Sequence, residues 1–180
     1  MKVFWNRTGI ALTLIPVLLV MGLIFGFSAQ NGETSGGLSR QITAWLAGIF
    51  IPDFELLAQE QQELIHSYMG LAIRKMGHFT EFAALGFFLM LHIHQIARRT
   101  AVSHPWLWAW AVGTVYAVSD EVHQHFVGGR NPAVTDVLID SAGVIAGVCL
   151  LLLFLRWQTK RSNKESVFSA GILIFLTSML

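Results

Sequence analysis

Residues 119–147 read SDEVHQHFVGGRNPAVTDVLIDSAGVIAG, a stretch that gathers charged and polar side chains between two strongly apolar runs. Only 13% of the whole chain is charged, so this concentration is not a consequence of composition. Charged groups at or near a bilayer are costly, and their presence there indicates a functional site. The side chains concerned are Asp120, Glu121, His123, Gln124, Arg130, Asp136 and Asp140.

The composition indicates the class of protein. Of the 180 residues, 54% are hydrophobic, and the mean hydropathy is +0.57. This is too apolar for a soluble domain of that size and predicts a polytopic membrane protein whose partner is the lipid bilayer. The net charge of +1 provides no basic surface, so no nucleic-acid partner is expected. The single cysteine, Cys149, excludes an intrachain disulfide and a cysteine-based metal site.

Four apolar runs are candidates for crossing a bilayer, which takes about 20 residues. They cover approximately residues 8–27, 76–97, 106–119 and 134–155, and the third is short enough that it should continue into its neighbours. A fifth run, 167–180, either spans the membrane with a tilt or lies in the interface. We therefore expect an all-α polytopic bundle of four spanning helices, with residues 1–165 as one transmembrane domain and 166–180 as an additional apolar segment.

The basic residues predict the orientation of the chain in the membrane. They precede the first run and follow the second and fourth, which places them on one side if the helices alternate in direction, and that side is then the cytoplasm. The N-terminus is thus expected in the cytoplasm, and both polar clusters are expected at the extracytoplasmic face. The residues used are Lys2, Arg7, Arg98, Arg99, Arg156, Lys160, Arg161 and Lys164.

The long segment between the first two runs, residues 28–75, has its own helical pattern. Apolar residues recur at i, i+3, i+4, i+7 and i+8 from Ile42 to Phe50, which predicts an amphipathic helix. Pro52 should end this helix, and Asp53 is a candidate N-cap for the next. Two helices lying in the outer membrane interface, or a lid packed on the spanning helices, both fit this pattern.

The start of the second run carries Lys75, His78 and Glu81 at i, i+3 and i+6. This spacing places the three side chains on one stripe of a helix, with Glu81 close enough to orient the imidazole of His78. Such a pair can act as a general base, a proton relay or two ligands of one metal. A structural hydrogen bond within the bundle is the alternative.

The fourth run carries Asp136 and Asp140 one turn apart, and Gly143 and Gly147 continue the same face as a GxxxG pattern. Glycines at this spacing let a second helix backbone approach closely, so both carboxylates should point into the bundle. A buried carboxylate needs a partner, and Arg130 is the obvious one. The same guanidinium also matches a phosphate or a substrate carboxylate.

The third run ends at Asp120 and Glu121, which point about 100° apart on a helix because they are adjacent. Glu121 and Gln124 are i, i+3 neighbours and can share a ligand. A solvated loop of acids and histidines is the alternative, and it is weakened because Asp120 directly ends an apolar run.

Taken together, these motifs resemble the VanZ-like family of bacterial membrane proteins, over about residues 27–155. The resemblance implies a multi-pass protein of the bacterial plasma membrane and an association with reduced susceptibility to the glycopeptide teicoplanin. Where the family often has Asn ten residues after its Gly-Arg pair, this chain has Asp140. Four passages carry the resemblance: residues 27–33 with Ser35 and Ser39; residues 73–75 with His78-Phe79, Glu81-Phe82 and Leu85-Gly86; Asp120-Glu121 with Gln124 and Phe126; and Gly129-Arg130 with Asp136, Gly143 and Gly147.

Three functions remain open at this point, and whether the protein is an enzyme is undecided. The first is binding of a lipid-linked envelope precursor or a glycopeptide through its anionic groups. The second is a membrane-embedded hydrolase or transferase on a lipid, in which the carboxylates hold a divalent cation, Mg²⁺ or Zn²⁺. The third is a proton-coupled transporter. The candidate acid/base residues are His78, Glu81, Asp120 and Glu121, and the candidate ligand-binding residues are Lys75, Gln124, Arg130, Asp136 and Asp140.

Overall fold

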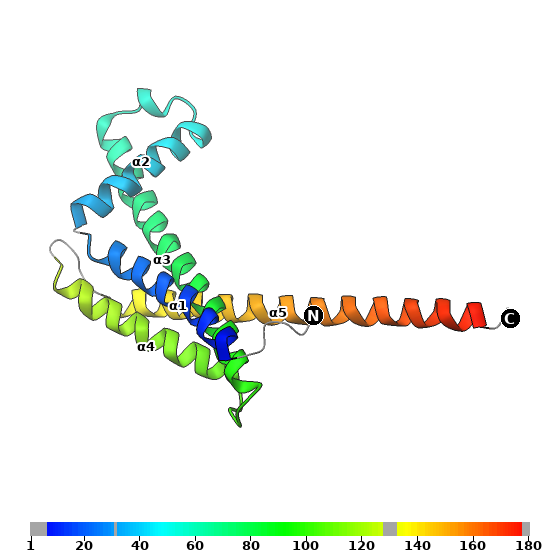
Figure 1. Cartoon of the computed structure of the whole chain (residues 1–180). Coiled ribbons are helices and arrows are strands. Elements are labelled where there is room, and N and C mark those ends of the chain that lie inside the picture. Colours follow the sequence, from blue (N-terminus) through cyan, green and yellow to red (C-terminus); the bar gives the residue numbers. More distant parts are fainter. Residues whose placement is uncertain (1–6, 31, 128–132, 178–180) are drawn as a thin grey trace.

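The computed structural model describes residues 7–30, 32–127 and 133–177, and the regular elements in these ranges are all helices (Figure 1). The expected all-α class is therefore confirmed. The elements are α1 (Arg7–Ser28), α2 (Gly32–Phe50), a short 3-10 helix η1 (Phe54–Leu56), α3 (Gln59–Ala97), α4 (Pro105–His125) and α5 (Val134–Thr177).

Three of these helices are long and apolar enough to cross a membrane: Ile10–Ser28 within α1, Gln59–Ala97 of α3, and Val134–Arg161 within α5. They correspond to the first, second and fourth expected spans. Helix α4 is not among them, because its last two turns are polar, so the third expected span, residues 106–119, stays a prediction. As expected, however, the third apolar run continues into the acidic segment, and α4 ends only at His125.

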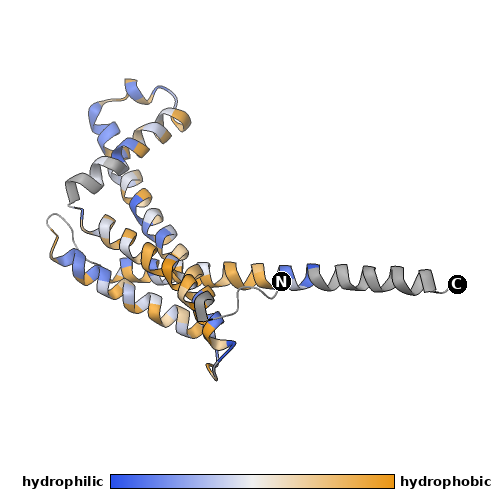
Figure 2. Cartoon of the chain, in the orientation of Figure 1, coloured by the Kyte–Doolittle hydropathy of each residue, from blue (hydrophilic) through white to orange (hydrophobic). Residues whose placement is uncertain are grey.

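Helices α1, α3, α4 and α5 pack into one bundle, in which the contact between α3 and α5 is the most extensive. Hydrophobic residues are concentrated in this bundle, whereas the first half of α3 and the C-terminal end of α4 are more hydrophilic (Figure 2). Lipid tails are as apolar as these side chains, so van der Waals packing and hydrogen bonds between the helices, and not removal from water, hold the spanning part of the bundle together. The core residues are Val17, Ile24, Phe82, Leu85, Leu89, Met90, Ala109, Ala117, Val144, Val148 and Leu151.

Glycines set the distance between α3 and α5. A Cβ atom on Gly143 would collide with the carbonyl oxygen of Phe79, and one on Gly147 would collide with that of Ala83. From the opposite side, Gly86 of α3 faces the backbone of Val144 in the same way. The close approach of two backbones expected from the GxxxG pattern is confirmed, and only glycine is compatible with it.

Polar side chains link the helices laterally. The Tyr116 hydroxyl of α4 donates a hydrogen bond of 2.7 Å to the carbonyl oxygen of Met21 in α1. The Trp110 Nε1–H donates to Ser141 Oγ at 3.0 Å and connects α4 to α5. Hydrogen bonds between helices of membrane proteins contribute about 0.6 kcal/mol each on average. These bonds therefore orient α4 against its neighbours more than they stabilise the bundle.

The outer segment differs in one respect from the expectation of two separate interfacial helices. The second of them is continuous with the spanning helix: α3 runs without interruption for 39 residues, roughly 58 Å at 1.5 Å per residue. This is about twice the thickness of a hydrocarbon core, so the first half of α3 extends beyond the bundle together with α2 (Figure 1). Nothing in residues 59–75 breaks a helix, which explains the continuity.

The amphipathic helix expected before Pro52 is α2, which ends at Phe50. Its small residues Thr43 and Ala47 are fully buried, whereas Trp45 is 66% exposed and Ile49 57% exposed. The apolar stripe therefore does not pack on the spanning helices as a lid would require. Asp53 stands at the N-cap position of η1, with a left-handed φ of 54° and no capping hydrogen bond from its side chain.

Helix α3 starts instead after Ala58, whose N–H donates to Gln61 Oε1 at 3.3 Å. At the other end of the chain, the backbone of α5 continues as one helix through the basic segment 156–165 to Thr177. The domain boundary expected at residue 165 and the membrane placement of residues 167–180 stay predictions.

Candidate functional site

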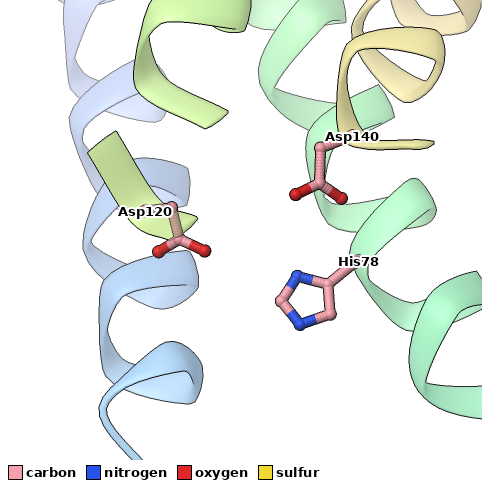
Figure 3. Close-up of side chains that lie close together, drawn as sticks. All are labelled: His78, Asp120 and Asp140. Atoms are coloured by element: carbon pink, nitrogen blue, oxygen red, sulfur yellow. The ribbon is translucent and has the colours of Figure 1, made fainter. Parts of the chain in front are cut away.

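Three side chains from three helices meet at one end of the bundle. His78 of α3, Asp120 of α4 and Asp140 of α5 each offer one ligand atom, and these atoms all lie within 4.8 Å of one another. The imidazole and the two carboxylates point toward one another (Figure 3). The carboxylates are almost completely buried, with Asp120 3% exposed and Asp140 1% exposed. The two polar segments identified in the sequence thus converge, although 42 residues separate His78 from Asp120.

The packing of α3 against α5 explains how His78 and Asp140 come together. His78 precedes Phe79, whose carbonyl oxygen lies against Gly143. Asp140 stands one turn before Gly143 on the same face of α5. The glycine contact therefore brings the two helix backbones closest next to the polar cluster, and it holds the imidazole and the carboxylate within reach of each other.

Hydrogen bonds hold the carboxylate of Asp120 in place. Its Oδ2 accepts a bond of 2.7 Å from Ser28 Oγ, at the end of α1. The same oxygen accepts a bond of 2.8 Å from Gln124 Nε2, one turn further along α4. Each bond to a charged acceptor is worth about 1.5–3 kcal/mol. Ser28 and Gln124 thus fix the orientation of Asp120 and direct its second oxygen toward the cluster.

That second oxygen is an exception to the usual pairing of buried polar atoms. Asp120 Oδ1 and Asp140 Oδ1 are both buried, and neither has a hydrogen-bond partner among the described residues. The negative charges of Asp120, Glu121, Asp136 and Glu81 also repel a charge on Asp140. A buried carboxylate in such surroundings needs a compensating proton or cation.

The remaining acidic candidates lie around this cluster. Glu121 Oε1 accepts a hydrogen bond of 2.7 Å from the N–H of Ala133, and it therefore connects the end of α4 to the start of α5. Glu81 lines a cavity together with His78, as expected from their spacing on one helix stripe. Whether either carboxylate acts as an acid or base stays a prediction.

Lys75 and Asp136 form an ion pair across α3 and α5, with 2.5 Å between Nζ and Oδ1. Their side chains are 34% and 37% exposed, so the pair lies at the edge of the bundle and not in the buried cluster. From the sequence, Arg130 was the expected partner of the carboxylates of Asp136 and Asp140. That residue lies outside the described residues, and its expected role stays a prediction.

Two adjoining cavities open beside the cluster, between α2 and α3. The inner cavity, of about 180 Å³, contains His78 and Glu81 in its wall. The outer cavity, of about 470 Å³, lies further along the same two helices. Ser39 and Arg74 line both, so the two form a continuous groove that leads to His78. The rest of the inner wall is largely apolar, with Phe27, Ile42 and Ile73.

Two residues at this site were not assigned a role from the sequence. Ser28 holds Asp120, but a serine at the end of an apolar helix is too common to indicate this. Arg74 lines the groove and makes no ion pair with another described residue. The signal for Arg74 was present, because it stands beside Lys75 and about 100° around the helix from it. Of the nearby histidines, His123 stacks on Phe25 at 4.4 Å, and His125 is exposed.

The fold and the cluster define a polytopic membrane helix bundle with a buried polar site at one end. The model of the VanZ/LLP1 family matches residues 13–156, most of the chain, and the protein belongs to this family. The resemblance expected from the sequence motifs is confirmed, and with it an association with glycopeptide resistance at the level of the family. No curated protein and no solved structure matches the chain.

Proposed function

We propose that this VanZ/LLP1 family member binds an anionic, lipid-linked molecule of the cell envelope in the groove between α2 and α3. The observation that carries the proposal is the groove itself: its outer cavity is polar, its inner cavity has a largely apolar wall that contains His78, and the guanidinium of Arg74 lines both. A lipid-linked precursor and a lipoglycopeptide share the chemistry this groove suits, namely a hydrocarbon chain beside an anionic group.

The charges along the groove favour Arg74 as the group that binds the anion. Arg40 also lines the outer cavity, but it forms a two-bond ion pair with Glu63. Lys75 is paired with Asp136. Arg74 is the cation of this wall for which the described residues provide no counterion, and its planar guanidinium suits a phosphate or carboxylate. Arg130, which lies outside the described residues, is proposed as a second contact to the anion.

The membrane placement is part of the proposal. We infer that α4 crosses the bilayer as a fourth span, because it packs against α3 and α5 and its 21 residues extend roughly 32 Å. With the N-terminus in the cytoplasm, the groove faces the extracytoplasmic side. The exposed Trp45 and Ile49 of α2 support its placement in the outer interface.

Titration of the purified protein in phosphatidylcholine nanodiscs tests the proposal. A polyprenyl phosphate should bind, and the matching polyprenyl alcohol should bind more weakly because it lacks the anion. Arg74→Ala removes charge-assisted bonds worth about 1.5–3 kcal/mol, so its affinity should fall roughly 10- to 100-fold. Arg99→Ala, which removes the same charge at the opposite end of α3, is the matched control and should bind like the wild type. Equal binding of phosphate and alcohol, or an unchanged Arg74→Ala, would refute the proposal.

A membrane-embedded hydrolase or transferase is the second candidate. The cluster of His78, Asp120 and Asp140 favours it, because an imidazole and two carboxylates at the end of the groove can serve acid–base or metal-assisted chemistry. Turnover of the same polyprenyl phosphate, lost in His78→Gln with the fold intact, would distinguish this function from binding alone.

A further inference from the structure

The buried cluster of His78, Asp120 and Asp140 has the composition of a metal site. We propose that these three side chains bind one divalent transition-metal ion, of the Zn²⁺ or Mn²⁺ kind. The site lies between α3, α4 and α5, so the ion would join three helices that are distant in sequence. Binding of the metal alone is the test, so this proposal stands or falls independently of the anionic ligand proposed above.

The distances between the donor atoms suit an ion of this size. If the three ligand atoms stood at the largest separation of 4.8 Å from one another, an ion between them would lie about 2.8 Å from each. Bonds to zinc are about 2.0–2.2 Å long. Each ligand atom would then move inward by less than 1 Å, which small side-chain rotations allow. Three protein ligands would leave a fourth coordination position for water or a ligand, as in catalytic zinc sites.

The unpartnered oxygens are the second and independent observation. Asp140 is 1% exposed and Asp120 3% exposed, and the Oδ1 atom of each has no hydrogen-bond partner among the described residues. Both carboxylates point into the cluster (Figure 3). A structural hydrogen-bond network would pair these oxygens, because an unsatisfied buried acceptor costs about 1–3 kcal/mol or more when charged. A metal ion satisfies both oxygens at once.

The charge balance also favours a cation. The carboxylates of Asp120, Glu121, Asp136 and Glu81 act unfavourably on the charge of Asp140. Among the described residues, one of these carboxylates has a cationic partner: Asp136 forms an ion pair with Lys75 at the edge of the bundle. A divalent ion between Asp120 and Asp140 would compensate both of their charges at the point where the repulsion is strongest.

The donor set narrows the choice of metal. Ca²⁺ and Mg²⁺ prefer oxygen ligands alone, whereas an imidazole with carboxylates suits Zn²⁺ and other first-row divalent ions. Ser28 and Gln124 would act in the second coordination shell by orienting Asp120, the role that such hydrogen bonds have in known metal sites. The ion could enter through the inner cavity, whose wall contains His78.

The experiment measures metal binding by the purified, metal-stripped protein in detergent. Calorimetric titration with Zn²⁺ and with Mn²⁺ should give about one equivalent bound at high affinity. Loss of a second-shell residue weakens metal sites about 10- to 100-fold, so Asp140→Asn and Asp120→Asn, which remove ligands, should lose at least about 100-fold. Asp53→Asn is the control: it removes the carboxylate of an exposed residue at the start of η1, outside the cluster, and should stay within a few-fold of the wild type.

A spectroscopic measurement on the intact protein covers the case in which a variant does not fold. Pulsed electron paramagnetic resonance of bound Mn²⁺ should detect the nitrogen of one imidazole in the wild type, and the signal should disappear in His78→Gln. The proposal is overturned if the wild type binds no ion, if Asp140→Asn binds like the wild type, if Asp53→Asn loses as much affinity as Asp140→Asn, or if bound Mn²⁺ shows no nitrogen ligand.

Discussion

Replacement of Gly147 by alanine should separate α3 from α5 and disrupt the polar cluster with them. The added Cβ would collide with the carbonyl oxygen of Ala83 and lie 2.7 Å from the backbone nitrogen of Phe87, whereas ordinary contacts begin at 3.4 Å. All of these neighbours are backbone atoms, which cannot rotate away. The two helices must therefore move apart by at least 0.7 Å, the difference between these two distances.

The energetic effect follows from the packing. Overfilling a well-packed interface costs about 1–3 kcal/mol, and for a protein of this size each kcal/mol lowers the melting temperature by roughly 2–4 °C. Thermal unfolding in detergent should thus show Gly147→Ala melting about 2–12 °C below the control. The control is Gly22→Ala in α1, where nothing lies within 4 Å of the added Cβ.

The same variant also tests the link between packing and site. The contact between Gly143 and Phe79 lies next to His78 and Asp140. A shift of α5 caused by Gly147→Ala, one turn further along, should therefore weaken metal binding. Equal melting temperatures of Gly147→Ala and Gly22→Ala would show that α3 and α5 do not pack as described. The position of the cluster would then lose its physical basis.

Three further experiments probe the contacts around the site. Ser28→Ala removes one of two donors to Asp120 Oδ2, so thermal unfolding should show a loss of about 1.5–3 kcal/mol; an unchanged stability would place Ser28 outside the site. For Lys75 and Asp136, a double-mutant cycle with Lys75→Gln and Asp136→Asn should give a coupling of only about 0–1 kcal/mol, since the pair is one-third exposed, and a coupling several-fold larger would show that the pair is buried. Ser141→Ala should destabilise the bundle more than Trp110→Phe, because Ser141 bonds to both Trp110 and Thr114; the reverse order would contradict these bonds.

Much of the fold could be predicted because the relevant signals are periodic. The apolar runs of α1, α3 and α5 are long, and the GxxxG pattern at Gly143 and Gly147 identifies the face of α5 that packs on α3. Asp140 and Asp136 precede Gly143 by about one and two turns, so they were expected on the same face of α5. The helical spacing before residue 76 continues into the second run, as α3 shows, but the change in hydropathy between residues 59–75 and 76–97 favoured an interfacial helix there.

The details of the site depend on helix rotation, which the sequence does not specify. Arg74 and Lys75 are adjacent cations, and only their orientation decides that Lys75 faces Asp136 while Arg74 lines the groove. Likewise, the bond from Ser28 to Asp120 joins residues 92 positions apart and depends on how α1 and α4 end side by side. Composition and spacing could place these residues at one end of the bundle but not pair them.

The central claim is that the polar cluster and its groove face the extracytoplasmic side of the membrane. Cysteine labelling on intact bacterial cells tests this most directly, in a Cys149→Ser background. Gln61→Cys, near the start of α3, and Thr100→Cys, just after its end, mark the two sides of the membrane. A membrane-impermeant maleimide should label Gln61→Cys in intact cells and Thr100→Cys only after permeabilisation. The opposite pattern would place the groove in the cytoplasm and contradict the account.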